Sequence, residues 1–139
     1  MTPFVLDASF TMTWIIEAEQ TPATMKYLEA LGRDENEALV PAIWPEEVAN
    51  VLLTLERAKK ISSAMVAGWI DTLNVLPIRI EPPSLEESFG AVRLLALTHK
   101  LTAYDASYLQ LALRSGAPLA TRDKALWASA EKVGVKLVR

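Results

Sequence analysis

Short apolar runs alternate along the chain with longer segments in which apolar residues recur at helical spacing. The first run ends at an aspartate, and four later runs resemble it in length and in their aliphatic content. The five predicted strands are residues 3–6, 38–40, 78–80, 118–121 and 135–138. The intervening segments predict helices at residues 9–17, 23–32, 44–59, 63–75, 84–98, 103–114 and 124–133.

The alternation of strands with helices predicts the fold class. Crossover connections of this kind give a mostly parallel sheet with helices on both faces, so we expect an α/β fold with about five strands. Ser84 and Glu87 fit a capping box, and Gly116 and Gly134 fall where helices would end. Ligands in such folds bind beyond the carboxyl ends of the strands, which makes the residues there the first candidates for a site.

Composition narrows the class of protein only in part. The chain has 139 residues, which predicts one domain over residues 1–139, and its net charge of −3 leaves the type of partner open. The absence of cysteine excludes disulfide scaffolds and thiol nucleophiles and is compatible with the cytoplasm, where we expect the protein. The N-terminus, with acids at Asp7 and Glu17, resembles neither a signal peptide nor a membrane span.

The apolar fraction suggests a partner. At 51% it is high for a free monomer of this size. We expect the following apolar residues to include some that another chain covers: Trp14, Ile15, Ile16, Trp44 and Trp69.

Four acidic residues lie where helices are predicted to begin. Asp7 ends the first predicted strand, Asp123 follows the fourth, and Glu47 and Asp105 fall in the first turns of two helices. Each alone is explained by capping, because a carboxylate near a helix N-terminus is stabilising by about 0.3–1 kcal/mol. Capping does not explain the four acids together. Helices that follow parallel strands start at one edge of the sheet, which would bring the four carboxylates close to one another.

Repulsion decides between these interpretations. Two like charges ~4 Å apart repel by roughly 4 kcal/mol at an effective dielectric constant near 20, which exceeds the benefit of one cap. A cluster of four therefore needs a cation or shared protons. Carboxylate oxygens without His or Cys suit hard divalent ions, so the sequence favours Mg²⁺ or Mn²⁺ bound by Asp7, Glu47, Asp105 and Asp123.

Polar side chains accompany the acids. Asn50 lies one helical turn after Glu47 on a polar stripe beside the apolar face of the third helix. Ser9 and Thr121 each lie two residues from one of the aspartates. Their hydroxyls have three possible partners: a carboxylate, a metal-bound water or a nearby amide.

Four segments together resemble one known family. They are "FVLDAS", "LVPAIWPEEVANVL", "LTAYDASYLQLA" and "PLATRDKAL", and their order and spacing span almost the whole chain. The chain is similar to PIN-domain ribonucleases, most closely the VapC-type toxins of toxin–antitoxin pairs. The resemblance implies a three-layer α/β/α sandwich whose acids bind one or two Mg²⁺ or Mn²⁺ ions and which hydrolyses RNA phosphodiester bonds. It also implies a homodimer, a small antitoxin partner and toxicity through RNA cleavage.

The functional positions of the family are all filled in this chain. The resemblance places its acids on Asp7, Glu47, Asp105 and Asp123, and the segment "EVAN" selects Glu47 over the neighbouring Glu46. The same comparison assigns supporting roles to Ser9, Asn50 and Thr121.

Other functions remain open. One alternative is a catalytically silent PIN-like module that binds an antitoxin or RNA without turnover. An aspartyl-phosphate phosphatase would need an acid where this chain has Ser9, and a receiver module would need an aspartate near Glu81. His99 is the one histidine and is expected in a loop, which gives no basis for a Ser-His-Asp triad.

Basic and aromatic residues are candidates for RNA contact. Trp14 and Trp44 could stack on a base or pack in the core. The basic candidates for steering RNA, each of which also serves as ordinary solubilising charge, are Arg57, Lys59, Lys60, Arg122 and Lys124.

Overall fold

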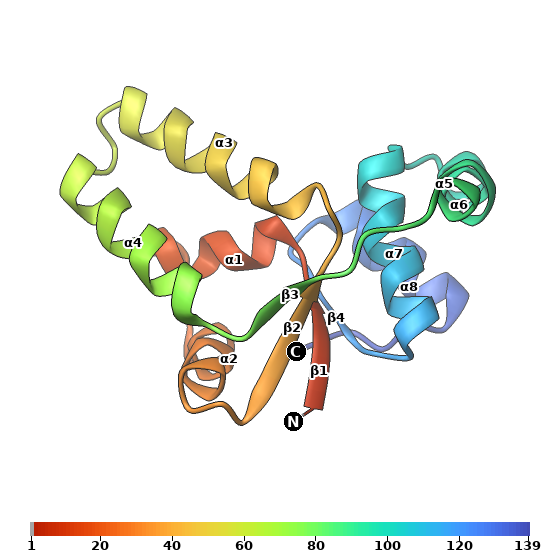
Figure 1. Ribbon diagram of the computed structural model, residues 1–139, viewed down its shortest axis with the longest axis horizontal. Helices are drawn as coiled ribbons and strands as arrows, with labels where there is room; N and C mark the ends of the chain where they lie inside the picture. Colours follow the sequence, from red (N-terminus) through yellow and green to blue (C-terminus); the bar gives the residue numbers. More distant parts are fainter. Residues whose placement is uncertain (1) are drawn as a thin grey trace.

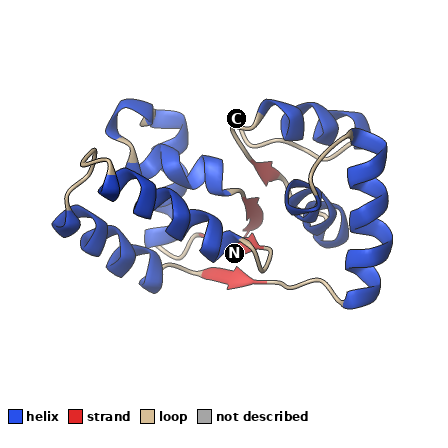
Figure 2. Ribbon diagram, turned by 90° about the horizontal axis from the view of Figure 1, so that it is seen from above, coloured by secondary structure: helices blue, strands red, loops and turns tan. Residues whose placement is uncertain are grey.

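The computed structural model describes residues 2–139 and contains a four-stranded sheet. Its strands are β1 (Thr2–Leu6), β2 (Asn36–Val40), β3 (Ile78–Ile80) and β4 (Leu119–Ala120). All neighbouring strands pair in parallel, in the order β3-β2-β1-β4. The sheet lies between two groups of helices, which confirms the predicted α/β class (Figures 1 and 2).

The helices divide between the two sides of the sheet according to their position in the chain (Figure 1). One group comprises α1 (Ala8–Ile15), the short η1 (Glu17–Glu19), α2 (Pro22–Gly32), α3 (Trp44–Arg57) and α4 (Ser63–Val75). The other comprises α5 (Leu85–Glu87), η2 (Ser88–Val92), α6 (Arg93–His99), α7 (Ala103–Ser115) and α8 (Lys124–Val133). In the part of the chain described, none of these helices combines the length and the apolar character needed to cross a membrane.

The strand order fixes where a ligand should bind. The chain runs from β1 outward through β2 to β3, and then returns so that β4 pairs with the other side of β1. The direction of winding therefore reverses between β1 and β4. In open parallel sheets this switch point, at the carboxyl ends of the strands, is the usual place for a ligand.

The prediction of about five strands is wrong, because the sheet has four. Residues 135–138 form only an isolated bridge between Leu119 and Leu137. The reason lies in the partner strand: β4 contains only two residues, so it offers one position for pairing on its outer side. Two hydrogen bonds, Leu119 N to Lys136 O at 2.8 Å and Val138 N to Leu119 O at 2.9 Å, close that edge.

The predicted helix at residues 84–98 is interrupted. A π-helical turn, η2, lies between α5 and α6, although the hydroxyl of Ser84 still accepts from Glu87 N as the capping pattern predicts. The spacing of apolar residues does not reveal a π-helical turn, because one extra residue in a single turn shifts the apolar face of the helix only locally.

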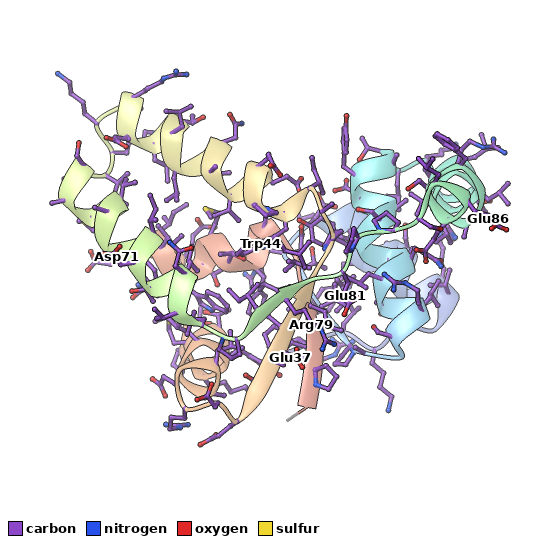
Figure 3. All side chains as sticks on the ribbon, in the orientation of Figure 1. Glu37, Trp44, Asp71, Arg79, Glu81 and Glu86 are labelled. Atoms are coloured by element: carbon purple, nitrogen blue, oxygen red, sulfur yellow. The ribbon has the colours of Figure 1, made fainter. Side chains whose placement is uncertain are left out.

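Two of the tryptophans expected to contact another chain are covered by this one. Trp14 is fully buried, and its indole Nε1 donates to Thr24 O at 2.9 Å. Trp44 is also buried and donates through Nε1 to Thr11 Oγ1 at 3.2 Å, which ties the start of α3 to α1 (Figure 3). Trp69 is only partly buried. Trp14 and Trp44 thus pack in the core of the chain itself, whereas other large apolar residues, such as Val75, Leu85 and Leu97, are exposed.

Candidate active site

Asp7 lies at the switch point and is held there by two hydroxyls. It follows β1 directly, and its side chain is buried, with 5% of the residue exposed. Ser9 Oγ donates to Asp7 Oδ2 at 2.6 Å and Thr121 Oγ1 donates to the same oxygen at 2.7 Å. Asp7 is the N-cap residue of α1, as the sequence predicted, but its carboxylate makes no capping hydrogen bond to the helix. The carboxylate is bound by the two hydroxyls instead.

The end of β4 completes the support of Asp7. Asp7 N donates to Ala120 O at 3.0 Å, which sets the ends of β1 and β4 side by side. Beyond β4, Thr121 Oγ1 accepts from Asp123 N at 3.0 Å, and Asp123 Oδ1 accepts from Leu126 N at 2.8 Å. Asp123 therefore caps α8. Thr121 links it to Asp7, because its hydroxyl is hydrogen-bonded to both residues.

Glu47 is joined to α7 by a buried tyrosine. Its Oε1 accepts a hydrogen bond from the hydroxyl of Tyr108 at 2.5 Å. Tyr108 is fully buried, and burial together with this bond raises its pKa well above the usual value, so the phenol keeps its proton and remains the donor. The neighbouring Glu46 is exposed, whereas Glu47 is half-buried, which is consistent with the choice of Glu47.

Asp105 lies in the first turn of α7 beside the residue that caps this helix. Thr102 is the N-cap of α7, and its Oγ1 accepts from Asp105 N at 3.1 Å. The carboxylate of Asp105 is half-buried in the first turn of the helix. Of the four acids, Asp123 alone caps a helix through its side chain.

The carboxylates act on one another electrostatically. Burial raises the pKa of Asp7, and the charge of Asp123 raises it further. Burial likewise raises the pKa of Glu47 and of Asp105, with added repulsion from Asp7 on both and from Asp123 on Asp105. Such mutual effects require the charges to lie near one another. The structure thus brings all four acids to one edge of the sheet.

The four carboxylates fit a divalent cation only if water molecules complete the coordination shell of the ion. Within residues 2–139, no group of three or more acidic or histidine side chains is arranged to hold a metal ion by itself. Mg²⁺ usually keeps several waters and takes one or two carboxylates directly, so a complete protein cage is unnecessary. The raised pKa values indicate that positive charge among these carboxylates would relieve burial and repulsion.

The remaining predicted residues divide by position. Asn50 is exposed one turn after Glu47, outside the hydrogen bonds described above. Arg122 and Lys124 are exposed beside Asp123, and Arg122 N donates to Ser9 Oγ at 2.9 Å. The remaining three basic candidates lie at the far end of α3, where Arg57 is about 15 Å along the helix from Glu47.

Tyr108 is a residue that sequence reasoning missed. It lies in the apolar stripe of α7, where periodicity predicts only a core residue. A signal for it existed, because a buried tyrosine usually finds a partner for its hydroxyl, and Asp105 lies three residues earlier on the same helix.

The chain belongs to the PIN-domain family, whose model matches residues 4–132. PIN domains are generally nucleases, and they typically use divalent metal ions. A comparison with curated protein sequences finds no match.

Two solved structures share the fold at low sequence identity. PAE2754 from Pyrobaculum aerophilum has 22% identity and a TM-score of 0.65, and the match covers 92% of this chain and 84% of that one. FitAcB from Neisseria gonorrhoeae has 18% identity and a TM-score of 0.58, with 98% of this chain and 96% of that one covered. Both likenesses concern the fold.

Asp7 should make the metal-free protein less stable as pH rises. Its raised pKa means that the folded state keeps a proton where the unfolded chain, with a pKa near 3.9, has released it. The contribution of Asp7 to the free energy of unfolding is therefore fully present below about pH 4 and falls as pH rises through the raised value. We expect the difference in unfolding free energy between the parent and Asp7→Asn to decrease across this window, with a limiting slope of about 1.4 kcal/mol per pH unit.

Urea denaturation in EDTA between pH 4 and 8 measures this difference. Asp71→Asn, an exposed site on α4 away from the cluster, is the matched control (Figure 3). A difference for Asp7→Asn that stays flat or grows with pH would contradict the burial of this charge.

Removing the tyrosine hydroxyl should raise the pKa of Glu47. The bond from Tyr108 opposes the effect of burial on that carboxyl, so Tyr108→Phe should leave burial and repulsion unopposed. Carboxyl-carbon NMR titration of the metal-free protein measures the pKa directly. Tyr27→Phe on α2 removes the same group from a tyrosine that makes no hydrogen bond to Glu47 and should have no effect. An unchanged or lower pKa for Glu47 in Tyr108→Phe would show that the hydroxyl does not hold this side chain.

Proposed function

We propose that this protein is a Mg²⁺- or Mn²⁺-dependent endoribonuclease that hydrolyses RNA phosphodiester bonds. The observation that carries the proposal is the geometry at the switch point of the sheet, where Ser9 and Thr121 hold the buried carboxylate of Asp7, Thr121 also binds Asp123 N, and Tyr108 holds Glu47. Membership of the PIN-domain family supports the same chemistry. Residues 1–139 act as one catalytic domain in this proposal.

Asp7 and Glu47 are the best placed to hold the cation. The two hydroxyl bonds to Asp7 both end on Oδ2 and fix the orientation of the carboxylate before an ion binds. Tyr108 occupies Oε1 of Glu47 and so orients its other oxygen. Asp105 and Asp123 add negative charge from two further helices and complete the binding set.

The cation, when bound, supplies activation of a water and neutralisation of charge at the phosphate. The protein's own part is to fix the geometry. Ser9 and Thr121 hold Asp7, Thr102 sets the direction of α7, and Asn50 lies within one turn of Glu47 as a polar contact for substrate or water. The exposed side chains of Arg122 and Lys124 attract the RNA backbone toward the acidic edge.

We further propose that the biological role is that of a VapC-type toxin in the cytoplasm. The support is the match of four sequence segments to that group and the complete set of acids. In this role the chain forms a homodimer, a small antitoxin protein inhibits it, and its cleavage of cellular RNA stops growth. A PIN-like module that binds RNA or an antitoxin without turnover is the competing outcome.

Cleavage assays with two adjacent glutamates test the nuclease. Purified protein should cut RNA in Mg²⁺ or Mn²⁺ and not in EDTA. Glu47→Gln should lower kcat/KM by more than about 100-fold, because changes to groups that only support metal ligands already cost about 10–100-fold. Glu46→Gln removes an exposed charge next to it and should stay within about twofold of the parent.

Two results would reject this assignment. One is cleavage that is equally fast in EDTA, and the other is a Glu47→Gln protein that is folded and cuts as well as the parent. Circular dichroism and thermal unfolding of both variants establish that they are folded.

Growth measurements test the toxin role separately. Induced expression of the parent chain should slow bacterial growth, while Asp7→Asn at the same soluble level should not. Co-expression of a small protein encoded next to this chain should restore growth. Equal growth of cells that make the parent and Asp7→Asn would remove the toxin role and leave the nuclease to be judged by cleavage alone.

A further inference from the structure

A chain of two buried hydrogen bonds joins the backbone of Asp7 to the first turn of α3. The indole Nε1 of Trp44 donates to Thr11 Oγ1 at 3.2 Å, and the same hydroxyl donates to Asp7 O at 3.1 Å. Thr11 is fully buried and Trp44 is 7% exposed, so water does not compete for either bond. Trp44 is therefore closed to a base of RNA, and its indole serves the interior of the protein.

The chemistry of the end groups fixes the direction of both bonds. An indole N–H can only donate and a backbone carbonyl can only accept, so the single proton of the Thr11 hydroxyl points to Asp7 O. The hydroxyl is satisfied only while α3 and the carbonyl of Asp7 both stay in place. Valine has a similar shape and would fill the same space, so packing alone does not explain the buried oxygen of Thr11.

A second buried threonine on α1 shows what such a hydroxyl does without a tertiary partner. Thr13 Oγ1 donates to Phe10 O at 2.7 Å, within its own helix. Threonine hydroxyls in helices commonly bond back to an earlier carbonyl in this way. Thr11 makes the same kind of bond to Asp7 O. The bond that it also accepts from Trp44 distinguishes it from Thr13.

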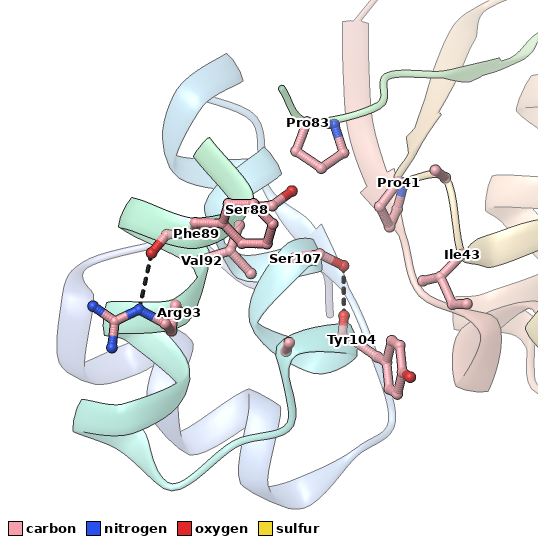
Figure 4. A pocket seen from close by; sticks show the side chains of 11 residues that line it. Pro41, Ile43, Pro83, Ser88, Phe89, Val92, Arg93, Tyr104 and Ser107 are labelled. Atoms are coloured by element: carbon pink, nitrogen blue, oxygen red, sulfur yellow. Dashed lines mark hydrogen bonds between the residues drawn. The ribbon is translucent and has the colours of Figure 1, made fainter. Parts of the chain in front are cut away.

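The first turn of α3 borders open space on two sides. Pro41 and Ile43, which lead into this helix, line a hollow of about 470 Å³ (Figure 4). A second hollow, of about 330 Å³, is lined in part by Trp44, Pro45 and Val48. Such spaces offer few atoms for contact, so packing fixes this turn less firmly than it would in a filled core. Ile43 is also the N-cap residue, and its apolar side chain cannot cap the helix.

Two side-chain hydrogen bonds hold this turn to neighbouring elements. Trp44 binds Thr11 on α1, and Glu47 accepts a bond from Tyr108 on α7. Thr11 in turn binds the carbonyl of Asp7 itself. One hydroxyl and one indole thus connect the backbone of Asp7 to the helix that carries Glu47.

We propose that Thr11 is a positioning residue that sets the separation between the carboxylates of Asp7 and Glu47. It fixes the start of α3 against the backbone of Asp7, while its own buried side chain contacts neither cation nor RNA. This inference rests on the proposed nuclease function, in which these two acids hold the divalent cation.

The separation of the two acids matters because of the geometry that the cation requires. Mg²⁺ needs near-octahedral coordination, with ligand distances of about 2.0–2.1 Å. A carboxylate that shifts with the start of α3 no longer meets the ion and its waters at these distances. The hydroxyl of Thr11 therefore acts on the site through the position of Glu47 relative to Asp7.

Mn²⁺ binding to the metal-free protein, measured by isothermal titration calorimetry, tests this role. Thr11→Val removes the hydroxyl and should raise the Kd by about 10-fold, the lower end of the cost of removing a group that directly supports a metal ligand. Thr11→Ser keeps the hydroxyl and should bind as the parent does. Thr13→Val is the matched control on the same helix and should also bind as the parent does.

A double-mutant cycle shows whether Thr11 acts through Trp44. Trp44→Phe keeps a ring and removes the donor, so it should weaken Mn²⁺ binding as Thr11→Val does. The variant with both changes should bind no more weakly than the weaker single variant, because both changes break the same bond. Losses that multiply would reject the link. Circular dichroism establishes that each variant is folded, and Trp44→Phe decides in place of a Thr11→Val protein that does not fold.

NMR of the metal-free protein gives a readout that does not need the cation. In Thr11→Val the Nε1–H signal of Trp44 should move and exchange faster with water, and the carboxyl-carbon signal of Glu47 should shift. Thr13→Val should leave both signals unchanged. The positioning role is overturned by an unchanged Glu47 signal, by parent-like Mn²⁺ binding in Thr11→Val, by failure of Thr11→Ser to retain binding, or by an equal loss in Thr13→Val.

The two proposals fail in different ways. A parent protein that binds no Mn²⁺ rejects the metal-dependent nuclease, and the Glu47 signal of Thr11→Val then decides whether Thr11 positions this side chain. A parent that binds Mn²⁺ and cuts RNA, with a folded Thr11→Val equal to it in both, rejects the positioning role and leaves the nuclease intact.

Discussion

The pairing of β1 with β4 is the constraint on which the site depends. Because Asp7 N bonds to Ala120 O, the residues that follow both strands emerge together at the same edge. Thr121 then reaches across to the carboxylate of Asp7, and the buried charge gains two hydroxyl donors in place of water. A buried carboxylate without such donors would be far more costly to hold. The strand order therefore places the carboxylate of Asp7 at this edge and also brings Thr121 close enough to bind it.

At this edge of the sheet, helices α7 and α8 are capped in different ways. Thr102 caps α7, whereas Asp123 itself caps α8 and stays close to Asp7 through Thr121. Glu47 takes a partner from a different helix, the hydroxyl of Tyr108. The side chains of Asp7, Glu47 and Asp123 are therefore each held by a hydrogen bond before any ion arrives. Such preorganisation reduces the rearrangement that binding would require.

Much of this arrangement is predictable from local pattern. Residues 63–75 and 124–133 are helices with the predicted bounds, and residues 78–80 are a strand, because periodicity and caps act within each segment. The predictions fail where a structure depends on residues that are distant in sequence. The fifth strand depends on the length of β4, and the role of Tyr108 depends on α3 packing beside α7.

The outer strand of the sheet has a consequence for association between copies of the chain. Arg79 on β3 lies between Glu37 and Glu81, at 3.3 and 2.7 Å from their carboxylate oxygens (Figure 3). Charged side chains along an outer strand discourage an added strand from another molecule. The bridge at Leu137 covers the opposite side of the sheet. Both edges of the sheet therefore carry features that disfavour its growth from chain to chain.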